Sequence, residues 1–162
     1  MHEILVDENG YKQYFEELEK LKQLSLFNAS AGSQAFNDAV GDGWHDNFAF
    51  EETMRESRTI ATRIDKMISE EKYLKIIEPE QLGVEFINIG DSFEIEFKYD
   101  EDDIEKEQLT LTGKYKPDTD LTIKEISLNS PLGKAVYQQK INSTISYFVN
   151  GNKIEITILN KI

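Results

Sequence analysis

The stretch Val40-Gly41-Asp42-Gly43-Trp44-His45-Asp46-Asn47 determines how the first half of the chain folds. Two glycines within three residues are typical of a turn. Helical patterns of apolar residues lie on both sides of it, so the chain must reverse direction between two helices. We therefore expect an antiparallel helical hairpin whose turn lies near residues 41–47.

The apolar residues around this turn recur at helical spacing. Asp7 or Asn9 is expected to cap the first helix. The apolar face that follows comprises Tyr11, Tyr14, Phe15, Leu18, Leu21 and Leu24. A second helix is expected from Phe48 to about Lys75, with a heptad seam. The predicted seam consists of Phe50, Met54, Ser57, Ala61, Ile64, Ile68 and Glu71. Two helices of about 30 residues would form an arm about 45 Å long.

The second half of the chain alternates with period two, which is typical of strands. One such run contains Phe93, Ile95, Phe97 and Tyr99. Two others flank Asn150-Gly151, a strong hairpin signal. Ser130 followed by Pro131 favours the start of a short helix near 131–139.

These patterns predict an α+β protein with two domains. The first is a helical hairpin (a coiled coil) over residues 1–78, and the second is a small antiparallel β domain with a short helix over residues 79–162. We place the boundary near Glu78-Pro79, because proline disfavours helical geometry in the residue before it.

Composition excludes several functional classes. The 162 residues include 18 basic and 31 acidic side chains, giving a net charge of −13, which argues against a free-standing nucleic-acid binder. Cysteine is absent and only two histidines occur, which excludes disulfides, thiolate zinc sites and multi-histidine metal cages. No apolar run is long enough for a membrane span and no signal-peptide pattern begins the chain, so we expect a soluble cytoplasmic protein.

The predicted turn is the candidate functional site. Asp42 and Asp46 lie four positions apart, and two carboxylates on an exposed loop can share Mg²⁺. They cannot form a complete site, because Mg²⁺ takes about six oxygen ligands. The local alternative is that Asp46 or Asn47 caps the second helix while Asp42 stabilises the turn. Trp44 has no part of its own chain to pack against at the end of a solvated arm, which is typical of a partner surface.

The order and spacing of these motifs resemble the bacterial GreA/GreB transcript cleavage factors over essentially the whole chain. The matching segments are Asn9-Gly10-Tyr11, Glu16 to Lys22, Gly41-Asp42, Asp46-Asn47, Arg63-Ile64 and Ile126 to Ala135.

The resemblance implies that the second domain has an FKBP-like fold and docks on RNA polymerase. The docking residues carried over from the family motif are Ser130, Pro131 and Leu132. The hairpin would enter the secondary channel of the polymerase and stimulate cleavage of the backtracked RNA 3′ end.

At the tip, the resemblance implies that Asp42 and Asp46 help to hold Mg²⁺ shared with the polymerase, while Trp44, His45 and Asn47 shape the tip. The protein would then be no enzyme by itself. It would be a monomer with no cofactor of its own and no independent binding to nucleic acid.

The tip departs from the family pattern at two positions. The family places an Asp four residues before the Asn, whereas that position here is Gly43 and Asp42 lies one residue further away. The nearer acid is Asp46, where the family usually has Glu. A Gre-like regulator or inhibitor that binds the channel without stimulating cleavage is therefore the alternative. A prolyl isomerase and a structural adaptor that dimerises through its hairpin are two further alternatives.

Overall fold

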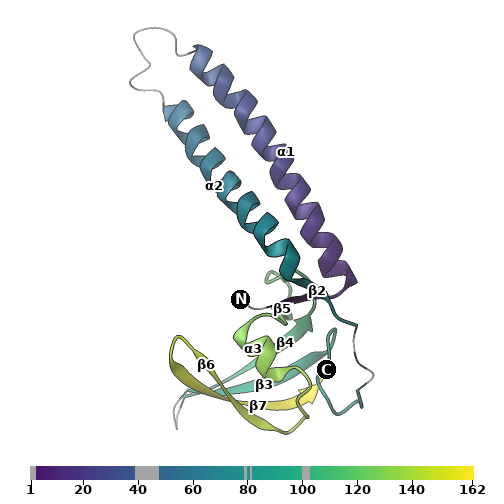
Figure 1. The fold of residues 1–162 in the computed structure, drawn as a ribbon. Coiled ribbons are helices and arrows are strands. Elements are labelled where there is room, and N and C mark those ends of the chain that lie inside the picture. Colours follow the sequence, from purple (N-terminus) through teal and green to yellow (C-terminus); the bar gives the residue numbers. More distant parts are fainter. Residues whose placement is uncertain (1–2, 39–47, 79, 81, 100–102) are drawn as a thin grey trace. The chain divides into compact units, whose positions relative to one another are not determined.

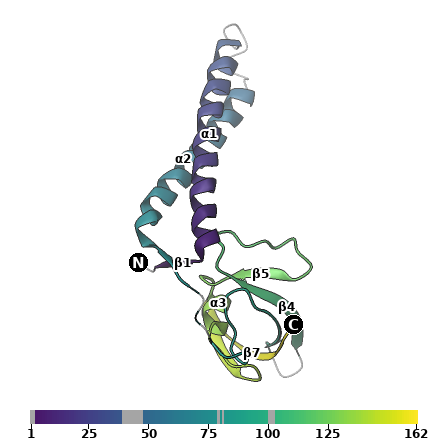
Figure 2. The same ribbon diagram turned by 90° about the vertical axis from the view of Figure 1, so that its right-hand side faces the viewer.

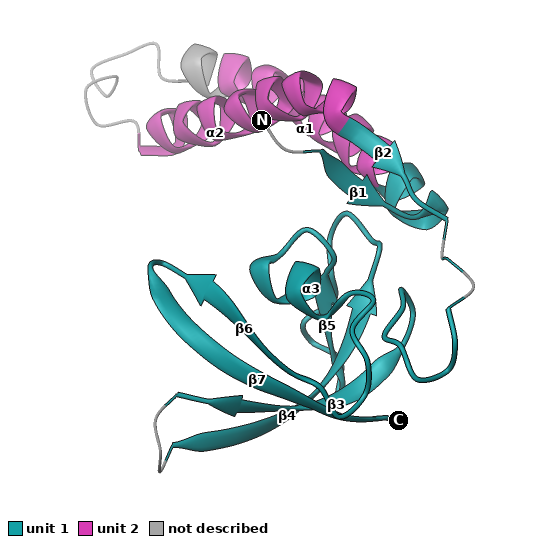
Figure 3. Cartoon of the chain, turned by 60° about the horizontal axis from the view of Figure 1, so that its bottom comes forward, with its two compact units in different colours: residues 1–13, 74–162 teal, residues 14–73 magenta. Residues whose placement is uncertain are grey.

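The computed structural model describes residues 3–38, 48–78, 80, 82–99 and 103–162. The chain divides into two compact units, coloured separately in Figure 3. One unit contains residues 1–13 and 74–162, and the other contains residues 14–73. The expected α+β class is confirmed, since a pair of helices precedes a sheet that consists mostly of antiparallel strands.

Helices α1 (Glu8–Asp38) and α2 (Phe48–Glu70) form the predicted antiparallel hairpin (Figure 1). Asp7 caps α1 as expected, because its Oδ1 accepts a hydrogen bond from the backbone N–H of Gly10 at 2.6 Å. Near the base of the hairpin, the hydroxyl of Tyr14 donates to the backbone carbonyl of Met67. Arg63 of α2 forms an ion pair of 3.6 Å with Glu17 of α1.

Each helix turns one heptad stripe toward the other helix. The buried or half-buried stripe of α1 consists of Tyr14, Leu18, Leu21, Ser25, Asn28 and Gly32. The corresponding stripe of α2 consists of Phe50, Thr53, Ser57, Ile60, Ile64 and Met67. We refer to these two stripes as the hairpin interior.

The predicted seam of α2 was therefore half wrong. Phe50, Ser57 and Ile64 belong to the hairpin interior, but the other apolar members of the predicted seam, Met54, Ala61 and Ile68, are exposed. A heptad repeat alternates steps of three and four residues, and α2 has apolar residues in two adjacent stripes with this spacing. Its sequence alone therefore fits either stripe as the buried one. Packing against α1 decides which stripe is buried, and the sequence of α2 alone does not contain this information.

The second helix also ends earlier than the predicted Lys75. The α-helix stops at Glu70, and the chain passes through the 3₁₀ turn η2 (Glu71–Tyr73) into strand β2 (Leu74–Ile76). This strand pairs in parallel with β1 (Ile4–Val6), with Ile4 opposite Leu74. Both strands have only three residues, too few to show an alternating pattern.

The sheet of the other unit has the strand order β5-β4-β3-β7-β6. Its members are β3 (Ser92–Lys98), β4 (Ile104–Thr112), β5 (Lys124–Ser127), β6 (Thr144–Val149) and β7 (Asn152–Lys161), some of which are labelled in Figure 2. Every pair is antiparallel except β4 with β5. The predicted hairpin at Asn150-Gly151 is confirmed, and both residues have the positive φ angles (50° and 83°) that such a turn requires.

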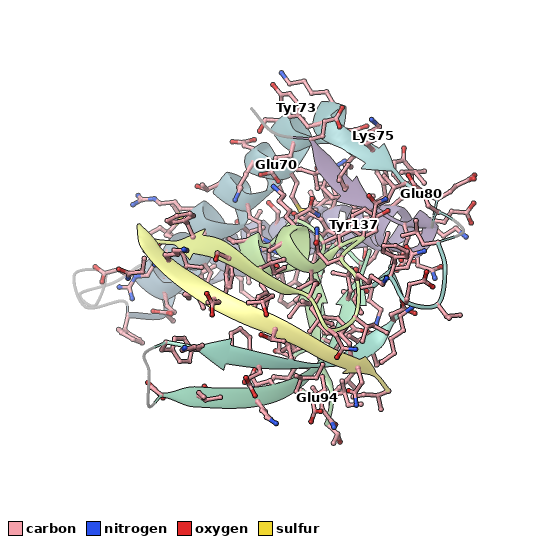
Figure 4. The ribbon with its side chains drawn as sticks, turned by 90° about the horizontal axis from the view of Figure 1, so that it is seen from below. Glu70, Tyr73, Lys75, Glu80, Glu94 and Tyr137 are labelled. Atoms are coloured by element: carbon pink, nitrogen blue, oxygen red, sulfur yellow. The ribbon has the colours of Figure 1, made fainter. Side chains whose placement is uncertain are left out.

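Helix α3 (Pro131–Val136) packs on the inner face of this sheet, and Tyr137 follows it directly (Figure 4). The helix begins where predicted and ends three residues before the expected position 139. The buried core beneath it consists of Ile87, Phe93, Ile95, Phe97, Leu109, Leu111, Leu128, Val136, Ile156 and Ile158. The alternating residues of β3 supply three members of this core, as the period-two pattern predicts.

We predict that Gly133→Ala strongly destabilises the β domain. Gly133 is buried in α3, and an added Cβ would overlap the backbone carbonyl of Ser127, which cannot move without distorting the loop. The expected loss is about 2–4 kcal/mol. Urea unfolding of the full chain, followed by far-ultraviolet circular dichroism, measures it.

The matched control is Gly32→Ala in α1. Its Cβ would make an ordinary contact of 3.4 Å with Cγ2 of Thr53, so the higher helix propensity of alanine should stabilise the hairpin by about 0.5–1 kcal/mol. Equal effects of the two substitutions would contradict the packing described for Gly133.

Candidate functional site

The five predicted tip residues lie outside the described residues. Asp42, Trp44, His45, Asp46 and Asn47 all belong to residues 39–47, which connect the end of α1 to the start of α2. The metal and contact roles of these residues remain predictions.

Some of the charges on the described part of the hairpin form ion pairs. Arg55 pairs with Glu52 at 3.4 Å, and Arg63 pairs with Glu17. Within the described ranges, no three His, Asp or Glu residues are grouped so that they could hold a metal. No helix in those ranges is long and apolar enough to cross a membrane.

The hairpin interior becomes polar toward the turn. Asn28 is buried between the helices, with 6% of its surface exposed, and its Nδ2 lies 3.5 Å from Oε2 of Glu56. Gly32 and Ser57 lie beside it in the same interior. Around Asn28 the described interior therefore consists mainly of small and polar residues, and Phe50 is the large apolar residue at the start of α2.

The predicted docking residues Ser130, Pro131 and Leu132 occupy different environments. The Oγ of Ser130 donates to the carbonyl of Ser127 at 2.7 Å and accepts from the N–H of Gly133 at 2.9 Å, so it caps α3. Leu132 is half-buried and packs on the sheet core. Pro131 is the member of the three whose side chain is exposed.

Asn129, which the sequence analysis did not single out, connects this loop to β1. Its Nδ2 donates to the carbonyl of Leu5 at 2.7 Å, and its Oδ1 accepts from the N–H of Leu5 at 2.8 Å. The side-chain amide thus pairs with the backbone of Leu5 as a neighbouring strand would. No local pattern signals this contact, because it joins residues 124 positions apart.

A cluster of tyrosines and carboxylates lies at the β3–β4 end of the sheet. Tyr99 stacks on Phe97 with ring centroids 6.1 Å apart. Burial raises the pKa of Tyr99, and the carboxylates of Glu105, Glu107 and Asp103 raise it further. The pKa of Tyr147 is raised first by burial and then by Tyr99 and Glu107.

Comparison with known proteins supports the resemblance. A family model described as the C-terminal part of the GreA/GreB transcription elongation factors matches residues 85–160, which span β3 to β7. The chain is also 28% identical to the transcription elongation factor GreA of Caldanaerobacter subterraneus subsp. tengcongensis over 159 residues. That alignment covers 96% of this chain and 95% of the relative, so it includes both units. Residues 85–160 therefore match the GreA/GreB family model, and the chain as a whole is similar to GreA factors.

Other relatives match over a similar length. GreA of Thermoanaerobacter pseudethanolicus is 27% identical, with 96% of this chain and 95% of the relative covered. Among solved structures, GreA factor homolog 1 (Gfh1) of Thermus thermophilus covers 99% of both chains at 19% identity with a TM-score of 0.44.

We predict that Ser130→Ala destabilises the β domain by about 1 kcal/mol, because the backbone N–H of Gly133 loses its cap. Pro131→Ala is the matched control, since its exposed side chain should change stability by less than about 0.5 kcal/mol. Urea unfolding of both variants measures the difference. A Ser130 variant as stable as the wild type would contradict the capping role.

We predict that Glu107→Gln lowers the pKa of both Tyr99 and Tyr147, because one negative charge acts on both phenols. Glu94→Gln, outside these two sets of interacting groups, is the control. Ultraviolet absorbance of tyrosinate during a pH titration measures both.

The two raised pKa values also affect stability. Unfolded tyrosine titrates near pH 10, so the stabilising contribution of the neutral phenols is fully present below about pH 10. It is lost as the pH rises through their higher folded-state pKa values. Unfolding measured above pH 10 should show this loss, and a smaller loss in Glu107→Gln.

Proposed function

We propose that this protein is a transcription elongation factor that binds RNA polymerase and stimulates cleavage of backtracked RNA. The observation that carries the proposal is the match to GreA factors along 96% of the chain. The helical hairpin supports it, because helix α1 has 31 residues and is therefore about 46 Å long. An arm of that length can carry side chains into a deep channel.

Asp42 and Asp46 are the residues we assign to the chemistry. They lie on the segment that joins α1 to α2, so the hairpin would deliver both carboxylates together. Carboxylate oxygens suit Mg²⁺, and the polymerase and the RNA phosphate would complete the coordination. Bound there, Mg²⁺ would activate water and stabilise the developing charge on phosphodiester oxygens.

The protein itself would contribute positioning and charge, and the polymerase would catalyse the hydrolysis. Trp44, His45 and Asn47 would shape the tip, and Pro131 would present an exposed surface for docking. Ser130 and Leu132 would act at that surface through the loop and core that they stabilise. Such a factor would work in the cytoplasm, where bacterial RNA polymerase is found.

A channel-binding regulator that does not stimulate cleavage is the second candidate. The spacing of the tip favours it, since Asp42 lies five residues before Asn47 and glycine occupies the family position for the acid. Positioning errors of about 1 Å can reduce catalysis about 100-fold. A misplaced carboxylate would leave a hairpin that binds the polymerase without increasing cleavage.

We predict that the wild-type protein stimulates RNA cleavage in a backtracked complex of its cognate polymerase with Mg²⁺. Asp42→Ala and Asp46→Ala should each reduce the stimulation at least about tenfold, because each removes a metal ligand while leaving the helices intact. Glu16→Ala is the matched control, since Glu16 is an exposed carboxylate on the described part of α1. Gel analysis of radiolabelled RNA measures cleavage.

Binding to the polymerase is measured in parallel. Tight binding without stimulation would contradict the cleavage factor and establish the regulator instead. Absence of both binding and stimulation would contradict both proposals.

A further inference from the structure

Helix α2 has a second heptad stripe, which lies beside the interior stripe, about 100° further around the helix. Its members are Met54, Arg58, Ala61, Asp65 and Ile68, at steps of four, three, four and three residues. All five are exposed, whereas the residues of the interior stripe on the same helix are buried or half-buried. We call these five residues the outer stripe.

The apolar members of the outer stripe repeat once per heptad. Met54 is 39% exposed and Ile68 is 50% exposed, and Ala61 lies midway between them. Met54 also lines an open groove of about 400 Å³ together with Ala29 and Ser33 of α1. A helix with two adjacent apolar stripes is typical of bundles with more than two helices.

The charged members of the outer stripe have no ion-pair partner among the described residues. Neither Arg58 nor Asp65 forms an ion pair with another described residue, whereas Arg55, Arg63 and Lys66 of the same helix all do. Arg58 and Asp65 alternate with the apolar members, so they would lie within any helix–helix contact made by this stripe.

The outer stripe is complementary to itself when two copies run antiparallel. With Ala61 at the two-fold axis, Met54 of one copy lies opposite Ile68 of the second copy. Arg58 then lies within one residue, about 1.5 Å along the helix axis, of the level of Asp65 of the second copy, and the symmetry repeats this pair. A parallel arrangement would instead place Arg58 opposite Arg58 and Asp65 opposite Asp65, which is repulsive.

We propose that the outer stripe is an interface through which two copies of this chain pair with antiparallel two-fold symmetry. The small alanine at the centre lets the helices approach closely, and the two ion pairs select the antiparallel register. An interface of about four helical turns is small, so the pairing should be weak and dependent on concentration. Dilute protein would then be monomeric, as the sequence analysis expects.

This pairing goes beyond the proposed function and does not depend on it. It would occupy the same face of α2 in both copies and remove that face from contact with any other partner. The protein concentration would therefore control how many hairpins have a free outer stripe.

Sedimentation velocity of the full chain from about 1 to about 500 µM, at about 150 mM salt, tests the proposal. The wild type should shift from monomer to dimer over this range. Arg58→Asp and Asp65→Arg should each weaken association about tenfold or more, because each places like charges opposite one another twice. The double variant R58D/D65R should associate to within about threefold of the wild type.

Mixing the two single variants tests whether residues 58 and 65 lie in the contact. In an antiparallel pair of one R58D chain and one D65R chain, each introduced charge meets its opposite, so the mixture should associate although neither variant does so alone. Arg55→Asp is the matched control, because Arg55 is exposed on α2 but outside the outer stripe. It should associate as the wild type does.

A wild type that stays monomeric at the highest concentration would overturn the proposal. So would a dimer that Arg58→Asp leaves intact, since this would place the contact on another surface. Failure of both the double variant and the mixture to restore association would exclude the antiparallel register. Circular dichroism of every variant verifies that the helices are retained.

Discussion

Contact between the two interior stripes of α1 and α2 is the constraint on which the hairpin depends. At the base, Tyr14 and Leu18 face Ile60 and Met67, and apolar burial holds the helices together. Farther out, most interior residues are small or polar, with Asn28 at the centre and Phe50 as the apolar exception. A buried polar residue in a heptad favours one register over slipped alternatives at some cost in stability. The helices are thus held together more strongly at the base of the hairpin than in its outer half, where the buried Asn28 favours one register.

The sequence predicted the elements of the hairpin but not their packing. The helical spacing of apolar residues and the glycines of the turn located both helices, because these signals are local in the sequence. Choosing between Thr53 and Met54, or between Ile60 and Ala61, requires the position of α1, and no local pattern contains it. The same limit explains the missed strands β1 and β2, because three residues form a strand there only by pairing with a distant segment.

The candidate site shows the same difference between features with a local signal and features that depend on distant residues. The capping role of Ser130 was predictable, because Ser followed by Pro at the start of a helix is a local signal. Asn129 was missed, because its partner Leu5 lies at the other end of the chain. The tip acids were identified through residue type and family resemblance, and their function rests on partners that the chain does not contain. Caps and turns could be inferred from short motifs, whereas packing, long-range pairing and intermolecular chemistry could not.

The division of the chain into units also explains how the arm could vary among relatives. The chain leaves the β-containing unit after residue 13 and re-enters it at residue 74, and the parallel strands β1 and β2 bring these two ends together. The hairpin is thus an insertion whose two ends are held by the same strand pair. Adding or removing one heptad in each helix would change its reach by about 10 Å and leave the register of β1 with β2 unaltered. Reach and anchoring can therefore evolve as separate properties.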